Sequence, residues 1–153
     1  MSLSAIQARL TFMVPSFAGR VYVAREMDSA VEYAATRSGG SPSAVVFDPV
    51  ETAGANGMRV GRSVVQDVVL QFTVLTCVRY AGDSAKAIAD LDAVRDDVRA
   101  AMVGWTGISA DNNPVEFVKG SLAFNASVEE YANVGVAIWA DVFRTEFLVR
   151  SIQ

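Results

Sequence analysis

The sequence predicts an α/β protein of the α+β kind, with a mixed, mainly antiparallel sheet and helices packed on it. Three observations support this prediction. Apolar residues recur at helical spacing in some segments and alternate with polar residues in others. Most neighbouring strands need only short connections, which favours antiparallel pairing. The chain has 153 residues, which is typical of one domain, so we expect a single domain over residues 1–153.

The first part of the chain predicts two helices and a short strand. Residues 3–13 place four apolar side chains at helical spacing, namely Leu3, Ile6, Leu10 and Met13, and Pro15 ends this segment. Residues 20–25 form a candidate strand. Ser29 and Glu32 have the spacing of a capping box, which predicts that a second helix begins there and ends at a glycine pair.

The middle of the chain predicts two strands separated by a long loop. The apolar run 44–47 is typical of an inner strand, and residues 49–63 form a glycine-rich loop of a length that is often functional. Residues 64–80 give the longest β pattern. One face of this strand carries Val68, Leu70, Phe72, Val74, Val78 and Tyr80, and the other carries Gln71, Thr73 and Arg79.

A third helix is predicted to follow a cap at Asp83 or Ser84 and to end near residue 103, before Gly104 in a left-handed conformation. Its apolar stripe consists of Ile88, Leu91, Val94, Val98 and Met102. We expect its solvent side to carry Asp90, Asp92, Arg95, Asp96 and Arg99. The predicted order of elements is therefore α-β-α-β-β-α-β-β.

Two further strands are predicted at residues 115–124 and 134–152, joined by an acidic connection with Glu129 and Glu130. Large aromatic side chains on periodic elements belong to the core more often than to a ligand pocket. We therefore expect four aromatic residues to be structural core residues: Trp105, Trp139, Phe143 and Phe147.

Composition excludes several classes of function. The hydrophobic fraction is 52% and the net charge is −4, which indicates a globular protein and argues against a nucleic-acid-binding module. Residues 1–13 lack the features of a signal peptide, and no window predicts a membrane span, so we expect a soluble, cytoplasmic protein without a membrane partner. Eleven arginines and two lysines favour either protein interfaces or a GC-rich genome.

The chain offers no set of catalytic residues. It has no histidine, which removes Ser-His-Asp and Cys-His systems and almost all zinc sites. The single cysteine, Cys77, lies in a β-patterned run and is expected to be a small buried side chain. The third helix's aspartates alternate with arginines, which favours a solvated face over a cation site. We expect no catalytic, cofactor-binding or metal-binding residues and no enzymatic activity.

Several short fragments, in their order and spacing along the chain, carry a resemblance to a known protein family. They are Ser41-Pro42-Ser43-Ala44-Val45-Val46-Phe47, Gly61-Arg62 with Gln66, Val78-Arg79-Tyr80, Gly104-Trp105, Pro114-Val115-Glu116-Phe117 with Gly120, and Trp139-Ala140-Asp141-Val142-Phe143-Arg144-Thr145. In this order and spacing, across residues 20–150, the sequence resembles the tail terminator proteins of long-tailed phages and Mu-like prophages.

The resemblance implies a structural subunit of the virion tail that is assembled in the cytoplasm of the bacterial host. Such a protein sits as a ring, a hexamer, on the head-proximal end of the tail tube. It stops polymerisation of the tube and meets the head completion or connector protein, while DNA passes through the lumen of the ring. The partners are then other copies of this chain, the tail tube protein and the head protein. We expect Asn56, Arg59 and Arg62, in the long loop, to contact a neighbouring subunit.

Two alternatives remain open from the sequence. A head–tail connector or another neck protein shares the size, the acidity and the ring assembly. A small-ligand-binding or enzymatic α/β domain would need a deep pocket with convergent polar groups.

Overall fold

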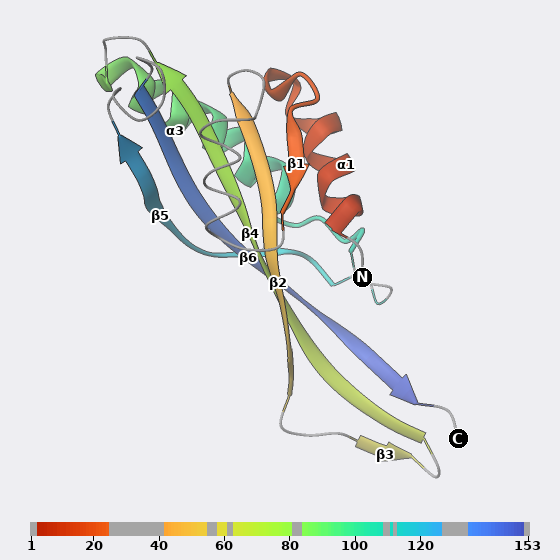
Figure 1. Ribbon diagram of the computed structural model, residues 1–153. Helices are drawn as coiled ribbons and strands as arrows, with labels where there is room; N and C mark the ends of the chain where they lie inside the picture. The colour runs from red at the N-terminus through yellow and green to blue at the C-terminus, as the bar shows by residue number, and fades with distance from the viewer. Residues whose placement is uncertain are drawn as a thin grey trace.

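The computed structural model of the chain describes residues 3–24, 42–54, 58–60, 63–80, 84–108, 111, 113–126 and 135–151. In these residues, helices cover one face of a six-stranded sheet (Figure 1). The elements are α1 (Leu3–Met13), the 3-10 helix η1 (Pro15–Phe17), β1 (Val21–Val23), β2 (Ser43–Ala53), β3 (Met58–Val60), β4 (Ser63–Tyr80), α3 (Ser84–Met102), β5 (Glu116–Ala126) and β6 (Gly135–Ser151).

The sheet has the order β1-β2-β4-β6-β5, and β3 pairs with β4 outside this path. Among the described strands, β1 and β2 run parallel, while all other pairs are antiparallel. The predicted mixed, mainly antiparallel sheet with packed helices is therefore confirmed. The pairing of β4 with β6 is the longest, from Val64↔Ser151 to Tyr80↔Gly135, and these two strands form the centre of the sheet.

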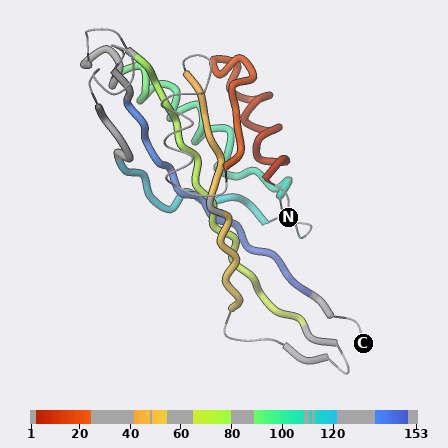
Figure 2. The backbone as a smooth tube through the Cα atoms, viewed as in Figure 1, coloured from red at the N-terminus to blue at the C-terminus, as the bar shows by residue number. Residues whose placement is uncertain are grey.

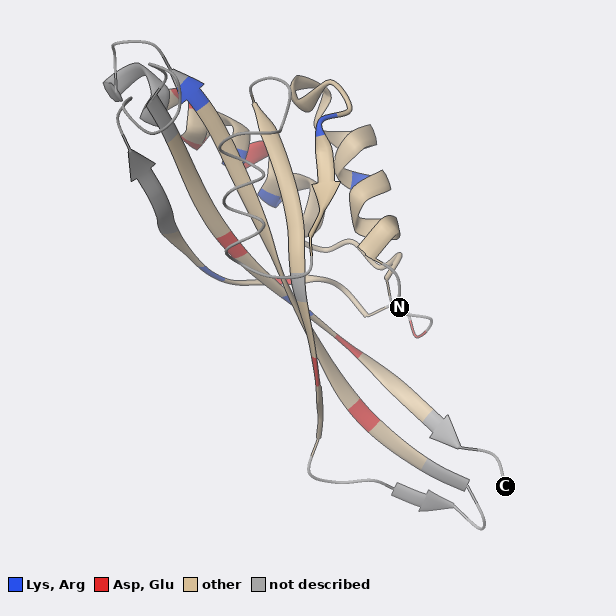
Figure 3. Ribbon diagram, viewed as in Figure 1, with Lys and Arg blue, Asp and Glu red and all other residues tan. Residues whose placement is uncertain are grey.

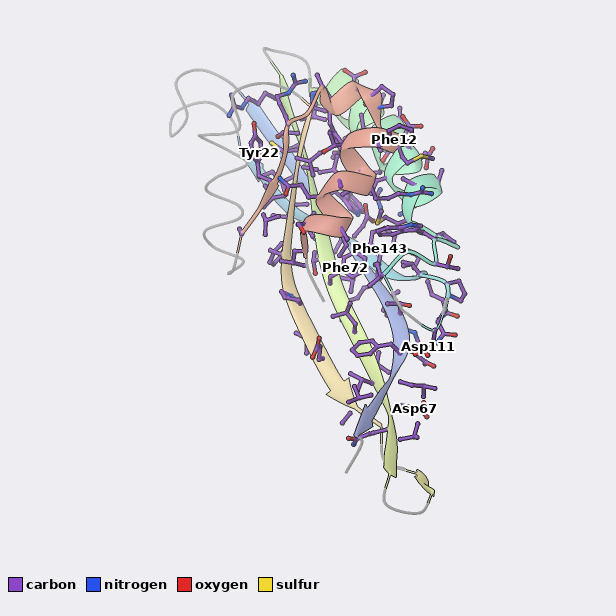
Figure 4. All side chains as sticks on the ribbon, turned by 90° about the vertical axis from the view of Figure 1, so that its right-hand side faces the viewer. Phe12, Tyr22, Asp67, Phe72, Asp111 and Phe143 are labelled. Atoms are coloured by element: carbon purple, nitrogen blue, oxygen red, sulfur yellow. The ribbon has the colours of Figure 1, made fainter. Side chains whose placement is uncertain are left out.

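The main core lies between the two helices and the sheet face beneath them, called the helix face below. Phe72 of β4 and Phe143 of β6 lie opposite each other there, with ring centroids 5.7 Å apart (Figure 4). The predicted stripe of α3 is confirmed where its side chains are described. In α1 the predicted stripe is buried at Ile6 and Leu10, but Met13 is 39% exposed. The buried members are Ile6 and Leu10 of α1 and Leu91, Val94, Val98 and Met102 of α3.

The other face of the sheet points away from these helices and is called the opposite face below. It is also buried in the part of the sheet that lies beside the helices. Val45 and Phe47 of β2, Leu75 of β4 and Ile138 of β6 are almost completely inaccessible to solvent. Thr73, predicted on the polar side of its strand, is 8% exposed. The central strands thus bury both faces, which the alternating pattern alone does not predict.

The long strands extend well beyond the helices. At about 3.3 Å per residue, the 18 residues of β4 span roughly 59 Å, while the 19 residues of α3 rise only about 29 Å at 1.5 Å per residue. One end of the sheet therefore projects from the helical body (Figure 2). This projection, called the β-arm below, consists of residues 50–53 of β2, β3, residues 63–70 of β4 and residues 145–151 of β6.

The predicted loop over residues 49–63 is wrong for most of its described part. β2 continues to Ala53 after an irregularity between Phe47 and Val50, and Met58–Val60 forms β3. Pro49 lies at this irregularity, where a missing N–H is tolerated in a strand. Both segments pair with β4, which supplies hydrogen-bond partners that no local pattern reveals.

The other predicted elements agree with the structure in type. The first helix has the predicted bounds, the third ends at Met102, and Gly104 has a φ of 82°, as expected for a left-handed helix end. β1, β5 and β6 fall within about two residues of their predicted ranges. The second predicted helix, with Ser29 and Glu32, and the acidic connection with Glu129 and Glu130 lie outside the described residues.

Candidate interaction surface

The residues predicted to contact a neighbouring subunit are only partly described. Arg59 lies on β3, where it pairs with Val64 of β4. β3 lies at the end of the β-arm that is farthest from the helices (Figure 1). Asn56 and Arg62 lie outside the described residues. The backbone thus places Arg59 on the β-arm rather than in an irregular loop.

The four aromatic residues predicted as core occupy different environments. Phe143 is completely buried, and Phe147 is partly buried against the same core where the β-arm begins. Trp105 follows α3 and is also partly buried against that core. Trp139 packs against a smaller buried cluster formed by Val78, Leu91 and Ala137.

A buried ion-pair cluster joins α3 to the helix face of β6. The Asp141 carboxylate is 0% exposed and accepts two hydrogen bonds from Arg95, at 3.1 Å from Nε and 2.9 Å from an Nη atom. A guanidinium nitrogen of Arg99 lies 3.5 Å from the same carboxylate. Two arginines from one helix turn therefore compensate one carboxylate, which makes its burial possible.

The neighbouring strand leaves room for this cluster. A Cβ atom on Gly120 of β5 would lie 2.5 Å from Asp141 Oδ1 and 2.8 Å from the Trp139 indole nitrogen. Glycine at this position therefore lets β5 pass close to the cluster. The Arg95 guanidinium lies 4.0 Å from the centroid of the Trp139 ring, and that of Arg99 lies 4.6 Å from the centroid of the Phe117 ring. These contacts add cation–π attraction to the ion pairs.

This cluster corrects the prediction that Arg95 and Arg99 belong to the solvent side of the third helix. Arg95 is only 6% exposed, and Arg99 is half-buried. The aspartates Asp90, Asp92, Asp96 and Asp97 are exposed, as predicted for a solvated face. One signal could have revealed the cluster. Asp141 lies between Trp139 and Phe143 on the apolar face of the last strand, where a charge requires an opposite charge.

The β-arm carries apolar side chains on both faces. Apolar side chains that are exposed or half-buried are Phe147 and Val149 on the helix face and Val50, Val65, Val69 and Leu148 on the opposite face, whereas Val68 and Leu70 are buried. Val50 and Val149 are 48% and 45% exposed. Apolar surface on both faces of a projecting sheet is typical of a segment that packs against another chain.

The β-arm also has one sign of charge among its described side chains. Glu51, Asp67 and Glu146 are exposed, and all three are acidic (Figure 3). Asp67 lies farther from the helices than Phe72 does (Figure 4). At the base of the β-arm, Arg144 donates to Glu116 at 3.0 Å and lies 3.8 Å from Glu146.

The described residues include one buried thiol and no candidate metal-binding group. No group of three or more His, Cys, Asp or Glu residues among them could hold a metal ion. Burial raises the pKa of the Cys77 thiol to about 11, although Arg79 and a hydrogen bond with Ser43 act in the opposite direction. At neutral pH this thiol is protonated and therefore a poor nucleophile. No helix in the described ranges has both the length and the apolar character needed to cross a membrane.

Comparison with known proteins gives the family. No curated protein matches the chain significantly. A family model described as "Phage tail terminator protein" matches residues 1–153, which is the whole chain. The chain therefore belongs to the phage tail terminator family.

Proposed function

We propose that this protein forms a homo-oligomeric ring, a hexamer, at the head-proximal end of the tail tube. There it stops polymerisation of the tube and joins the tail to the head completion or connector protein. Its membership of the tail terminator family makes it a structural component of a phage tail. The proposal adds three statements to this family membership: the ring, the number of its subunits and its position on the tail tube.

The β-arm is the observation that carries this proposal. It projects beyond the helices, is apolar on both faces and exposes Val50 and Val149 to solvent. Burying such surface against a neighbouring copy would contribute about 25 cal/mol per Å² of apolar area. A ring built by rotation uses two different patches per subunit, so a projecting segment can reach the body or the β-arm of the next copy.

The charge of the subunit suits passage of DNA through the ring. The chain has a net charge of −4, and the β-arm carries three exposed acidic side chains, Glu51, Asp67 and Glu146, in addition to Arg59 and Arg150. At physiological ionic strength, exposed charges interact over about 8 Å, so acidic residues that line a lumen would repel passing phosphates at short range. DNA would then cross the ring without binding to it.

Substitution of Arg59 and Arg62 tests whether the end of the β-arm contacts a neighbouring subunit. Because arginine forms charge-assisted hydrogen bonds across interfaces, replacing both residues by Glu should weaken ring assembly. Solution mass measured by light scattering checks this expectation. The control is Lys119→Glu at an exposed position of β5 outside the β-arm. Assembly of the Arg59→Glu/Arg62→Glu variant at wild-type concentration would argue against the contact.

The length of tubes tests the terminator function itself. The cognate tail tube protein is polymerised with increasing amounts of this protein, and tube lengths are measured by electron microscopy. The proposal predicts shorter tubes with a ring at one end. If the protein leaves tube length unchanged but is captured by portal or adaptor proteins, it is a head–tail connector instead.

A further inference from the structure

Among the described residues, the β-arm has two edges without a neighbouring strand, and they lie on opposite sides. On one side, β5 pairs with β6 only at residues 136–144 of β6, and the pairing ends where Glu116 lies opposite Arg144. On the other side, β1 pairs with β2 only up to Val23↔Val46. Within the described chain, no strand therefore pairs with the outer edge of β6 at residues 145–151 or with that of β2 at residues 50–53. Open edges of this kind are templates for adding a strand from another chain.

The hydrogen bonds of the β-arm show which backbone groups face outward from β2. The Gly54 N–H donates to the Asp67 carbonyl of β4 at 2.7 Å. In an antiparallel ladder, alternate residues direct both of their polar groups to the same neighbour. Thr52 and Val50 therefore face β4 as Gly54 does. The N–H and C=O groups of Glu51 and Ala53 point away from the sheet.

The outer edge of β6 follows from two side-chain contacts. The Leu148 N–H donates to the Asp111 carboxylate at 2.7 Å, and the Glu146 carbonyl accepts from the Asn113 amide at 2.9 Å. Both backbone groups therefore point away from β4. By the same alternation, the N–H and C=O groups of Arg150 also point outward.

Asp111 and Asn113, together called the edge cap below, bind two of the outward backbone groups on this edge. They give β6 one donor to the Glu146 carbonyl and one acceptor for the Leu148 N–H. A residue of a parallel strand placed opposite Phe147 would offer the same pair of groups. The edge cap thus fills that position. The outward groups beyond it are the Leu148 carbonyl and the N–H and C=O of Arg150.

We propose that β6 of one copy pairs in parallel with β2 of the next copy, with Glu51 opposite Val149. The Glu51 N–H then donates to the Leu148 carbonyl, and the Glu51 carbonyl accepts from the Arg150 N–H. Ala53, opposite Ser151, donates its N–H to the Arg150 carbonyl. This register leaves the edge cap in place. The inference deepens the proposed ring and rests on it.

Three features of the β-arm identify a second copy of this chain as the occupant. β2 and β6 are both antiparallel to β4, so they run in the same direction, and rotation about an axis along the β-arms keeps them parallel. Glu51 and Val149 both lie on the helix face, so that the pleat continues from one copy to the next. The two edges lie on opposite sides, so each copy binds one neighbour at each edge, and the contact is heterologous and can close into a ring.

A disulfide tests this register directly. In a Cys77→Ala background, which removes the native thiol, Glu51→Cys and Val149→Cys are combined in one chain. Directly opposed strand residues fall within the roughly 4.4–6.8 Å between Cα atoms that a disulfide requires. Mild oxidation should produce a ladder of covalent multimers that ends at the ring. The matched control combines Thr52→Cys with Val149→Cys, whose side chains lie on different faces, and should give no ladder.

A proline substitution tests the backbone contact. Ala53→Pro removes an N–H that faces outward, so pairing with β4 is kept, and Thr52 before it is already extended. The thermal unfolding midpoint should stay near that of the wild type, while the concentration needed for half-assembly should rise at least tenfold. Ala53→Val, which keeps the N–H, should assemble like the wild type.

The outcomes separate this inference from the proposed function. If wild-type protein forms rings and shortens tubes, but the Glu51→Cys/Val149→Cys variant gives no ladder, the edge pairing is wrong and the ring function stands. A ladder in the Thr52→Cys/Val149→Cys control as well would also reject the register. Wild-type protein that neither forms rings nor shortens tubes would overturn both.

Discussion

At the residue scale, the Asp141 cluster should be the most sensitive polar feature of the described structure. Its carboxylate is fully buried and bonded to Arg95 at 2.9 Å. Asp141→Ala should reduce the free energy of unfolding by about 3–5 kcal/mol, because a buried arginine would lose its opposite charge. Urea denaturation measures this loss.

Asp92 provides the matched control for Asp141. It also lies near Arg95, at 3.5 Å, but its side chain is 62% exposed. An exposed pair contributes about 0–1 kcal/mol, so Asp92→Ala should have little effect on unfolding. Equal losses for the two variants would show that burial does not determine the strength of this cluster.

Cys77 gives a second prediction at the same scale. Its ordinary pKa of 9.0 is raised to about 11 in the fold, mainly by burial. Folded protein at pH 8 should resist iodoacetamide and react only after unfolding, as mass spectrometry will show. The unfolded thiol loses its proton near pH 9 and the folded thiol near pH 11. The free energy of unfolding is therefore unaffected by this thiol below pH 9 and decreases as the pH rises from 9 to 11. Cys77→Ala should remove that part of the pH dependence, and rapid labelling of the folded protein would contradict the burial.

At the scale of single elements, α1 is held to the body by a narrow apolar stripe. Leu10 is completely buried, whereas Phe12, two residues away, is 81% exposed. Leu10→Ala should cost about 2–5 kcal/mol of unfolding free energy. Phe12→Ala should stay within about 0.5 kcal/mol. Thermal or urea unfolding compares the two, and a larger loss for Phe12 would mean that the helix packs by a different face.

The elements also show what sequence can predict. α1 and α3 were predictable because Ile6, Leu10, Val94 and Val98 repeat at the helical period, and this period depends only on neighbours in the chain. The loop predicted around Pro49 failed because residues 50–53 owe their strand conformation to pairing with β4. Such pairing is a tertiary effect that local propensity does not contain.

The candidate interaction surface was less predictable than the fold. The lengths of the predicted strands at residues 64–80 and 134–152 already exceed what one helix can cover, so the β-arm could have been inferred from length alone. Its two open edges could not, because they depend on where β1 and β5 stop pairing with their neighbours. The partners of Asp141 likewise come from a helix more than 40 residues away.

At the scale of the whole molecule, the family and the β-arm support the same arrangement. Tail terminator family membership gives a structural role in a phage tail. The β-arm supplies a projecting, two-sided apolar surface, with edges that are complementary in hydrogen bonding. The helices with one extended sheet thus provide two different contact surfaces per subunit, which a ring requires.

Solution mass by light scattering, for the protein alone and with its cognate tail tube protein, tests the ring most directly. The ring proposal predicts a defined species of six times the 16.3 kDa chain mass, either alone or on the end of the tube protein. A protein that keeps the mass of one chain at every concentration and ignores the tube protein would contradict it.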